Sequence, residues 1–106
     1  MLRKRGFHPE LTTHLELDSK NGIHATTGSL GHGLPIATGM ALGRKLQKID
    51  GRIIVMISDG ECQEGTTWES LLIGARYQLD NLLVIVDYNK IQALDTLENA
   101  IPLDSL

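Results

Sequence analysis

Two short apolar runs, separated by a stretch of helical length, constrain the fold of this 106-residue chain more than any other feature. The runs, residues 53–57 and 82–86, are rich in β-branched side chains and too short for helices, which indicates strands. Neither run alternates with polar residues, as is typical of parallel strands covered on both faces. Between them, over residues 66–78, apolar side chains recur at helical spacing. The sequence therefore predicts a right-handed βαβ unit and an α/β fold.

A glycine-rich turn at residues 28–33 precedes a second predicted helix over residues 34–48. Its three glycines permit positive φ and a close approach of other backbone. Small residues recur in the helix between larger apolar ones, so we expect it to pack tightly against a neighbouring backbone. No strand leads into the turn, so the glycines are not a dinucleotide-binding fingerprint. A turn followed by a buried helix explains this stretch as well as a ligand site does.

Each predicted strand is followed by a side chain that offers an oxygen ligand. Asp59 follows the first strand, and Asn89 lies 30 positions later, after the second. The carboxyl ends of parallel strands meet at one edge of a sheet, where open α/β sheets bind ligands. A carboxylate and an amide oxygen suit Mg²⁺, which takes its other ligands from water and phosphate. Both residues are also common in turns, so a metal site and two ordinary turns remain alternatives.

Size and composition exclude several classes of protein. A net charge of −3 offers no electrostatic basis for binding nucleic acid or an anionic membrane, and no apolar run approaches the ~20 residues that span a bilayer. The single cysteine, Cys62, cannot form an internal disulfide, which fits a reducing cytoplasm. Two fully apolar strands need neighbouring strands and helices. We therefore expect residues 1–106 to be an incomplete part of a larger cytoplasmic domain.

Three motifs together resemble a known family. Asp59-Gly60 followed about thirty residues later by Asn89 resembles the thiamine-diphosphate fingerprint, although Ser58 replaces its first glycine. With the sequence TTGSLGHG at residues 26–33 and the pair Glu64-Gly65, the chain resembles transketolase across residues 22–91. This resemblance implies the parallel βαβ portion of a doubly wound thiamine-diphosphate-binding fold. It also implies the N-terminal, diphosphate-binding domain of a transketolase, as a fragment or as part of a split enzyme.

The resemblance implies a set of cofactor and metal residues. Mg²⁺ would be held by the side chains of Asp59 and Asn89 and by the backbone carbonyl of Ile91. Thiamine diphosphate would lie against these residues and against three positions in the two glycine-containing turns, namely Gly28, Leu30 and Gly60.

The resemblance also implies catalytic residues. Glu64 and Glu69 would belong to an acidic network at a subunit interface, near the aminopyrimidine of the cofactor. A capping box with Thr66 explains Glu69 equally well. His8, in the sequence His-Pro-Glu, would contact the sugar phosphate, while His14 lies nearer the expected distance from Gly28 but lacks the proline.

The implied reaction is transfer of a two-carbon ketol unit between sugar phosphates, in a homo- or hetero-oligomer. A pyrimidine-binding domain or subunit would complete the site, so the isolated chain would be inactive. Three alternatives remain open. The chain could belong to another thiamine-diphosphate enzyme, either deoxyxylulose-phosphate synthase or a 2-oxoacid dehydrogenase E1. It could be a Mg²⁺-dependent phosphoryl-transfer or receiver-type domain with Asp59 as acceptor. It could also be a piece that only binds a partner subunit. The three motifs favour transketolase.

Overall fold

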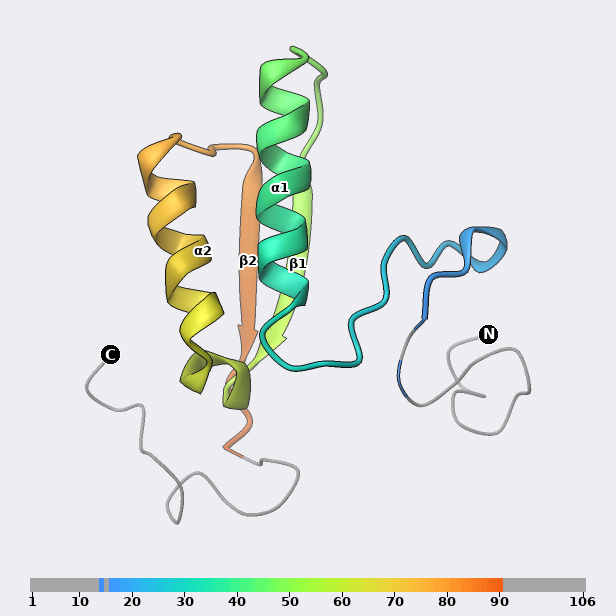
Figure 1. Ribbon diagram of the computed structural model, residues 1–106, viewed down its shortest axis with the longest axis vertical. Coiled ribbons are helices and arrows are strands. Elements are labelled where there is room, and N and C mark those ends of the chain that lie inside the picture. The colour runs from blue at the N-terminus through green and yellow to red at the C-terminus, as the bar shows by residue number, and fades with distance from the viewer. Residues whose placement is uncertain (1–13, 15, 91–106) are drawn as a thin grey trace.

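The computed structural model of the protein describes residue 14 and residues 16–90. Two parallel strands form a sheet, and two helices lie together on one side of it (Figure 1). The α/β class predicted from the sequence is therefore confirmed. The described elements are η2 (Ser19–Asn21), α1 (Gly33–Leu46), β1 (Ile53–Ser58), η3 (Gly60–Gln63), α2 (Gly65–Arg76) and β2 (Leu82–Asp87).

The two strands are aligned along their whole length. Ile53 pairs with Leu82 at one end, and Ser58 pairs with Asp87 at the other. Each strand is one residue longer than predicted, because Ser58 and Asp87 continue the ladder by one pair. Both strands therefore stop at the same edge, which we call the carboxyl edge. Figure 1 shows both arrowheads at that edge, where α1 and α2 also begin.

Small side chains bring the two helices close together. α1 buries Ala37, Thr38 and Ala41 beside Leu34, and it contacts both β1 and α2. α2 buries Thr67 and Ser70. The expectation that small residues of α1 allow tight packing is confirmed for Ala37 and Ala41, but not for Gly39 and Gly43, where an added Cβ would meet nothing within 4 Å.

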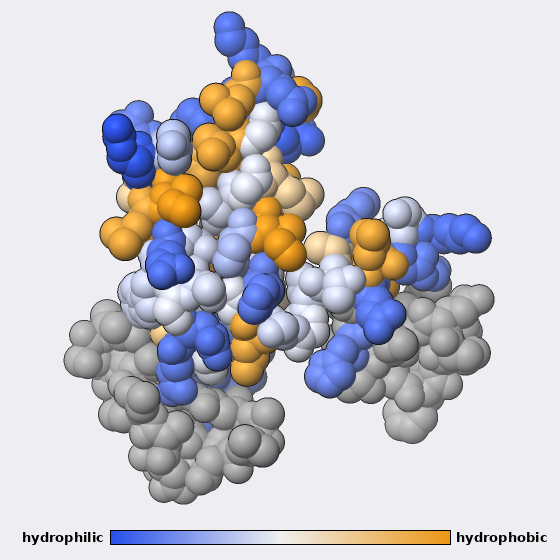
Figure 2. All heavy atoms as spheres, viewed as in Figure 1, coloured by the Kyte–Doolittle hydropathy of each residue, from blue (hydrophilic) through white to orange (hydrophobic). Residues whose placement is uncertain are grey.

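The apolar stripe that α2 itself carries at helical spacing, including Trp68, Leu71 and Leu72, does not lie in the core, whereas Leu79, just after the helix, is buried. Trp68 is 42% exposed and Leu72 is 71% exposed, while the small polar residues of this helix are buried. Figure 2 shows hydrophobic side chains at several places on the surface over both helices. Helical spacing predicted the helix correctly, but within the described residues that stripe faces outward.

One face of the sheet is also uncovered in the described part of the chain. Ile54 and Met56 alternate with less exposed neighbours, and their register partners, Leu83 and Ile85, are exposed as well. Successive strand side chains point to opposite faces, so these four residues share the face away from the helices. The cover on both faces that the sequence predicts is therefore present on only one face across residues 16–90.

The capping box with Thr66, one of the two explanations offered for Glu69, does not form at the start of α2. The helix begins after Glu64, which makes no side-chain cap bond. The Thr66 hydroxyl instead donates to the Gly31 carbonyl at 2.8 Å, and the Thr67 hydroxyl donates to the Glu61 carbonyl at 2.6 Å. Both threonines fasten the helix start to the preceding turns. Separately, none of the described helices has the length and apolar character that crossing a membrane requires.

Candidate functional site

Asp59 directly follows β1 at the carboxyl edge and is only 1% exposed. One carboxylate oxygen accepts the Gly60 N–H at 2.8 Å, and the other accepts the Lys90 N–H at 2.8 Å. Since Lys90 directly follows Asn89, the loop after β2 lies against the loop after β1. The prediction that both strand ends meet at one edge is confirmed, and the metal-binding role of Asp59 and Asn89 stays a prediction.

The loop after β2 turns sharply beyond the strand. The side-chain nitrogen of Asn89 donates to the Asp87 carboxylate at 3.1 Å. This bond uses the amide nitrogen, whereas a metal would bind the amide oxygen. Lys90 has a φ of 64°, and its ammonium lies 5.7 Å from the centre of the Tyr88 ring. The Lys90 side chain therefore packs on an aromatic face while its backbone N–H binds Asp59.

Glu61 joins two segments that are distant in sequence, and the sequence-based reasoning missed it. One carboxylate oxygen accepts the Ser58 N–H at 3.0 Å, and the other accepts the Gly31 N–H at 3.2 Å. The Glu61 N–H in turn donates to the Ser58 hydroxyl at 3.3 Å. The Ser58-x-x-Glu61 spacing is that of a reciprocal capping box, a signal that was present in the sequence. The bond to Gly31, 30 residues away, has no such local signal.

The Gly31 turn requires glycine. Its φ is +76°, and an added Cβ would lie 2.5 Å from the Thr66 hydroxyl oxygen and 2.8 Å from the Glu64 Cβ. These separations are too short for a real side chain. The turn that carries Gly28 and Leu30 thus sits directly on the start of α2, with Leu30 53% exposed.

The predicted acidic residues Glu64 and Glu69 are both exposed. Glu64 lies against Gly31, which directly follows Leu30 in the sequence. Glu69 lies on the first turns of α2. Their exposure leaves both carboxylates accessible to a second domain or subunit. Their roles remain predictions.

The histidine candidates differ in what the structure describes. His14 lies against Gly28, because a Cβ added to that glycine would be 3.1 Å from the His14 Cβ. His14 and His32 line a hollow of about 350 Å³ beside this turn. The His32 Nδ1 is 3.0 Å from the Leu30 carbonyl oxygen. His8 and Ile91 lie outside the described residues.

The surroundings of Cys62 change the pKa of its thiol. Burial chiefly, and then the charges of Asp59 and Glu61, raise the pKa of the Cys62 thiol. The thiol donates to the Ser58 carbonyl at 3.7 Å. A thiol with a raised pKa is a poor nucleophile at neutral pH, so the structure argues against covalent catalysis by Cys62.

Both helices start at the carboxyl edge without a side-chain cap. Neither His32, before α1, nor Glu64, before α2, makes a side-chain cap bond, and neither first turn holds an acidic residue. The first N–H groups of a helix carry a partial positive charge that favours anions. The edge therefore combines a buried carboxylate suited to a cation with helix starts suited to a phosphate. In the described part of the chain, no three His, Cys, Asp or Glu residues cluster as metal ligands.

Comparison with known proteins settles the family. The family model for the thiamine diphosphate binding domain of transketolase matches residues 2–102. This chain belongs to the transketolase family. The family and the domain that the sequence predicted are thereby confirmed, and the described α/β unit is part of a transketolase thiamine-diphosphate-binding domain.

Curated relatives of this transketolase-family chain include proteins named as transketolase subunits. The chain is 42% identical to an apulose-4-phosphate transketolase subunit of Phocaeicola vulgatus over 80% of its own length and 30% of the relative's. It is 42% identical to the protein of that name from Actinobacillus succinogenes, over 86% of its own length and 37% of the relative's. A 6-deoxy-6-sulfo-D-fructose transketolase subunit from Clostridium sp. is 38% identical, over 91% and 35%. The chain thus spans about a third of the length of these relatives.

Proposed function

We propose that this chain supplies the diphosphate and Mg²⁺ side of a transketolase that transfers a two-carbon ketol unit between sugar phosphates. The observation that carries the proposal is the buried Asp59 carboxylate, bonded to the loop that presents Asn89. A carboxylate with only 1% exposure is costly to bury without strong partners. A divalent cation at this edge would offset that cost beyond the two N–H bonds.

The donor set fits Mg²⁺. An ionised carboxylate has about four acceptor positions, and N–H groups occupy two of those on Asp59. Mg²⁺ is commonly bound by one or two carboxylates together with phosphate and water. The proposed protein ligands are therefore the Asp59 carboxylate, the Asn89 amide oxygen and the Ile91 carbonyl.

The surrounding residues fit the rest of thiamine diphosphate. Because Gly60 has no Cβ, a diphosphate could approach the main chain there closely. The uncapped starts of α1 and α2 favour the negative charge of the diphosphate. Gly28 and Leu30 would contact the cofactor from the turn held on α2. When bound, the cofactor supplies the electron-accepting centre that carbon–carbon bond cleavage requires. This chain's own residues position the cofactor.

The proton-handling and substrate residues complete the proposal. Glu64 and Glu69 are exposed on the start of α2, where a pyrimidine-binding domain or subunit would cover them. Burial between subunits would desolvate these acids and let them share protons with the cofactor. His14, against Gly28, and His8 are the candidates for holding the phosphate of the substrate.

The names of the relatives support a companion subunit. Three of them are named as subunits of a transketolase, which indicates enzymes assembled from more than one chain. The proposal is therefore a hetero-oligomeric enzyme in which this chain alone is inactive. The proposed location is the cytoplasm, which the single cysteine fits. Sugar phosphates or related sugar derivatives are the proposed substrates, because the relatives are named for apulose-4-phosphate and a sulfofructose.

Calorimetry with thiamine diphosphate and Mg²⁺, on the chain together with a pyrimidine-binding subunit, tests the proposal. We expect binding that needs the metal, and a loss of affinity of at least about 100-fold in Asp59→Ala, because a direct ligand should matter at least as much as an outer-shell one. Asp59→Asn, which keeps the shape and one acceptor, separates loss of charge from loss of fold. Asp80→Ala, at the opposite edge, is the matched control.

Metal-independent binding, or unchanged affinity in both Asp59 variants, would contradict the proposal. Phosphorylation of Asp59 by a small phosphodonor would favour a receiver-type domain. Cofactor binding without ketol transfer to any sugar phosphate would favour another thiamine-diphosphate enzyme.

A further inference from the structure

We propose that Glu61 is a positioning residue that fixes the turn carrying Leu30 relative to the turn carrying Asp59. The inference rests on the proposed function, since these two turns are the proposed contacts of the cofactor and its metal. It concerns a residue with no direct cofactor contact in that proposal. Its effect would be to hold the two parts of the site at one separation.

The carboxylate of Glu61 spans the two turns with one oxygen for each. Its bond to the Ser58 N–H holds the residue directly before Asp59, and its bond to the Gly31 N–H holds the residue directly after Leu30. Both donors are backbone groups, so the bridge fixes main-chain positions. Glu61 is itself only partly exposed, which strengthens both bonds relative to a fully solvated carboxylate.

Gly31 is hydrogen-bonded at its carbonyl as well as at its N–H. The Thr66 hydroxyl donates to the Gly31 carbonyl at 2.8 Å, while the Gly31 N–H binds Glu61. An added Cβ on Gly31 would lie 2.8 Å from the Glu64 Cβ, so Gly31 and Glu64 are in close contact. The two hydrogen bonds of Gly31 therefore also fix the position of Glu64 relative to Leu30. Glu61 and Thr66 together therefore position a proposed cofactor contact against a proposed proton-transfer residue.

The bond to Gly31 is not needed to form the turn that contains Glu61. A reciprocal capping box requires only the bonds between Glu61 and Ser58, and both are present. The second carboxylate oxygen is thus used entirely for the distant turn. Glutamine is the informative replacement, because its amide accepts at one atom only and its NH₂ group would face an N–H donor. Glu61→Gln keeps the size of the side chain and breaks one of the two bonds.

The test titrates thiamine diphosphate with Mg²⁺ into the full chain together with its pyrimidine-binding subunit. Trp68, the single tryptophan of the chain, donates to the Cys62 carbonyl at 2.9 Å and offers a fluorescence signal next to the site. We expect Glu61→Gln to raise the dissociation constant about tenfold, as loss of one hydrogen bond to a charged group predicts. Asp80→Asn, the same charge change at the opposite edge, should leave it unchanged.

Two further readouts separate positioning from stability. Amide hydrogen exchange, measured without cofactor, should accelerate in Glu61→Gln at Gly31 or at Ser58, whichever N–H loses its acceptor, while exchange at residues 54–57 of β1 stays slow. Thr66→Val removes the hydrogen bond to the Gly31 carbonyl and nearly preserves the shape of the side chain, so it should also weaken cofactor binding. The double variant should lose less affinity than the product of the two single losses, because each single variant already releases the same turn.

The outcomes distinguish the two proposals. A wild-type complex that does not bind the cofactor refutes the proposed function. Wild-type binding with an unchanged dissociation constant in Glu61→Gln overturns the role of Glu61 alone, even if its unfolding midpoint falls. If Glu61→Gln does not fold, unchanged binding by Thr66→Val overturns the role, and weakened binding supports it.

Discussion

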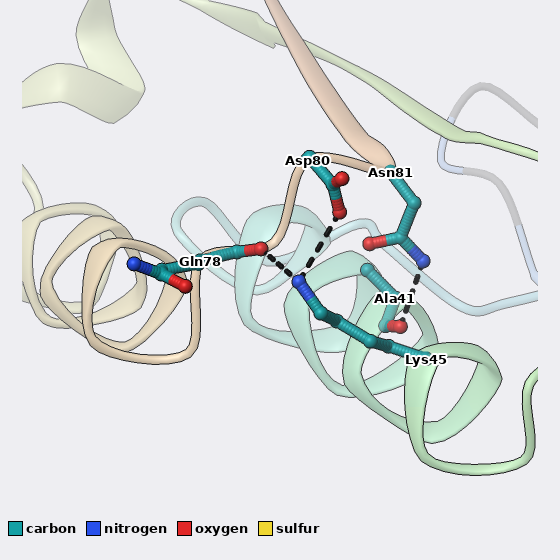
Figure 3. Close-up of polar contacts among 5 residues, drawn as sticks. All are labelled: Ala41, Lys45, Gln78, Asp80 and Asn81. Carbon is teal, nitrogen blue, oxygen red and sulfur yellow. Dashed lines mark hydrogen bonds and ion pairs between the residues drawn. The ribbon is translucent and has the colours of Figure 1, made fainter.

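The two edges of the sheet are built from opposite chemistry. At the carboxyl edge, the carboxylates of Asp59 and Glu61 accept backbone N–H groups from the Gly31 turn, from the end of β1 and from the loop after β2. At the amino edge, Lys45 donates to the Gln78 carbonyl and to Asp80, and Asn81 donates to the Ala41 carbonyl at 2.9 Å (Figure 3). Anionic acceptors hold one edge together, and cationic or amide donors hold the other.

This difference follows from the direction of the helices. Both helices start at the carboxyl edge and end at the amino edge (Figure 1), so the N–H ends of the helices face the first edge and the carbonyl ends face the second. At the amino edge, Lys45 lies in the last turn of α1, where a cation favours the helix dipole. The chain supplies its own donors there, whereas the uncapped helix starts leave the carboxyl edge suited to an external anion. The amino edge is therefore structural, and the carboxyl edge holds the candidate site.

The largest expected effect comes from breaking the carboxyl edge with Gly31→Ala. A left-handed backbone costs alanine about 1–2 kcal/mol, and the overlap with Thr66 and Glu64 adds about 1–3 kcal/mol. We expect the free energy of unfolding to fall by about 2–5 kcal/mol in urea titrations. The matched control is Gly39→Ala, in the middle of α1, where an added Cβ meets nothing within 4 Å. It should stabilise the protein by about 0.5–1 kcal/mol. Equal effects of the two variants would show that the Gly31 turn does not dock on α2.

A smaller effect is expected from breaking the amino edge with Lys45→Met. Methionine keeps the apolar stem of lysine and removes the bonds to Gln78 and Asp80. We expect a loss of about 1 kcal/mol in unfolding free energy, mainly from the lost bond to the Gln78 carbonyl. Affinity for thiamine diphosphate should stay unchanged, in contrast to Glu61→Gln. Weakened cofactor binding in Lys45→Met would contradict the conclusion that the amino edge is structural and only the carboxyl edge binds the cofactor.

The smallest effect concerns the pH dependence of the amino edge. The hydrogen bond from Lys45, and then its charge, lower the pKa of Asp80. A carboxylate with a lowered folded-state pKa stabilises the protein above its unfolded value near 3.8, and this stabilisation is lost as pH falls through the lower folded value. We expect thermal unfolding midpoints of the wild type to fall more than those of Asp80→Asn between about pH 5 and pH 2. Because Asp80 is exposed, the difference should be small and should shrink in high salt. Parallel curves for the two proteins would show that the Lys45–Asp80 pair contributes nothing to stability.

Local patterns in the sequence predicted the elements and much of the candidate site. The apolar runs located β1 and β2 to within one residue, because they are rich in β-branched residues and too short for a helix. The motifs around Asp59 and Gly28 identified the family that comparison confirmed. The start of α2 was predicted to within one residue, but the capping box at Thr66 does not form, because the Thr66 hydroxyl makes a tertiary bond to the Gly31 carbonyl instead.

Periodicity and short motifs thus determined which segments are strands and helices, and which residues follow the strands. Only the tertiary structure decided that Lys90 binds Asp59, that Glu61 reaches Gly31 across 30 residues, and that the apolar stripe of α2 faces outward among the described residues. The physical reason is that a backbone N–H group has no sequence signature. Every residue except proline carries one, so the partner of a carboxylate is chosen by how the segments pack.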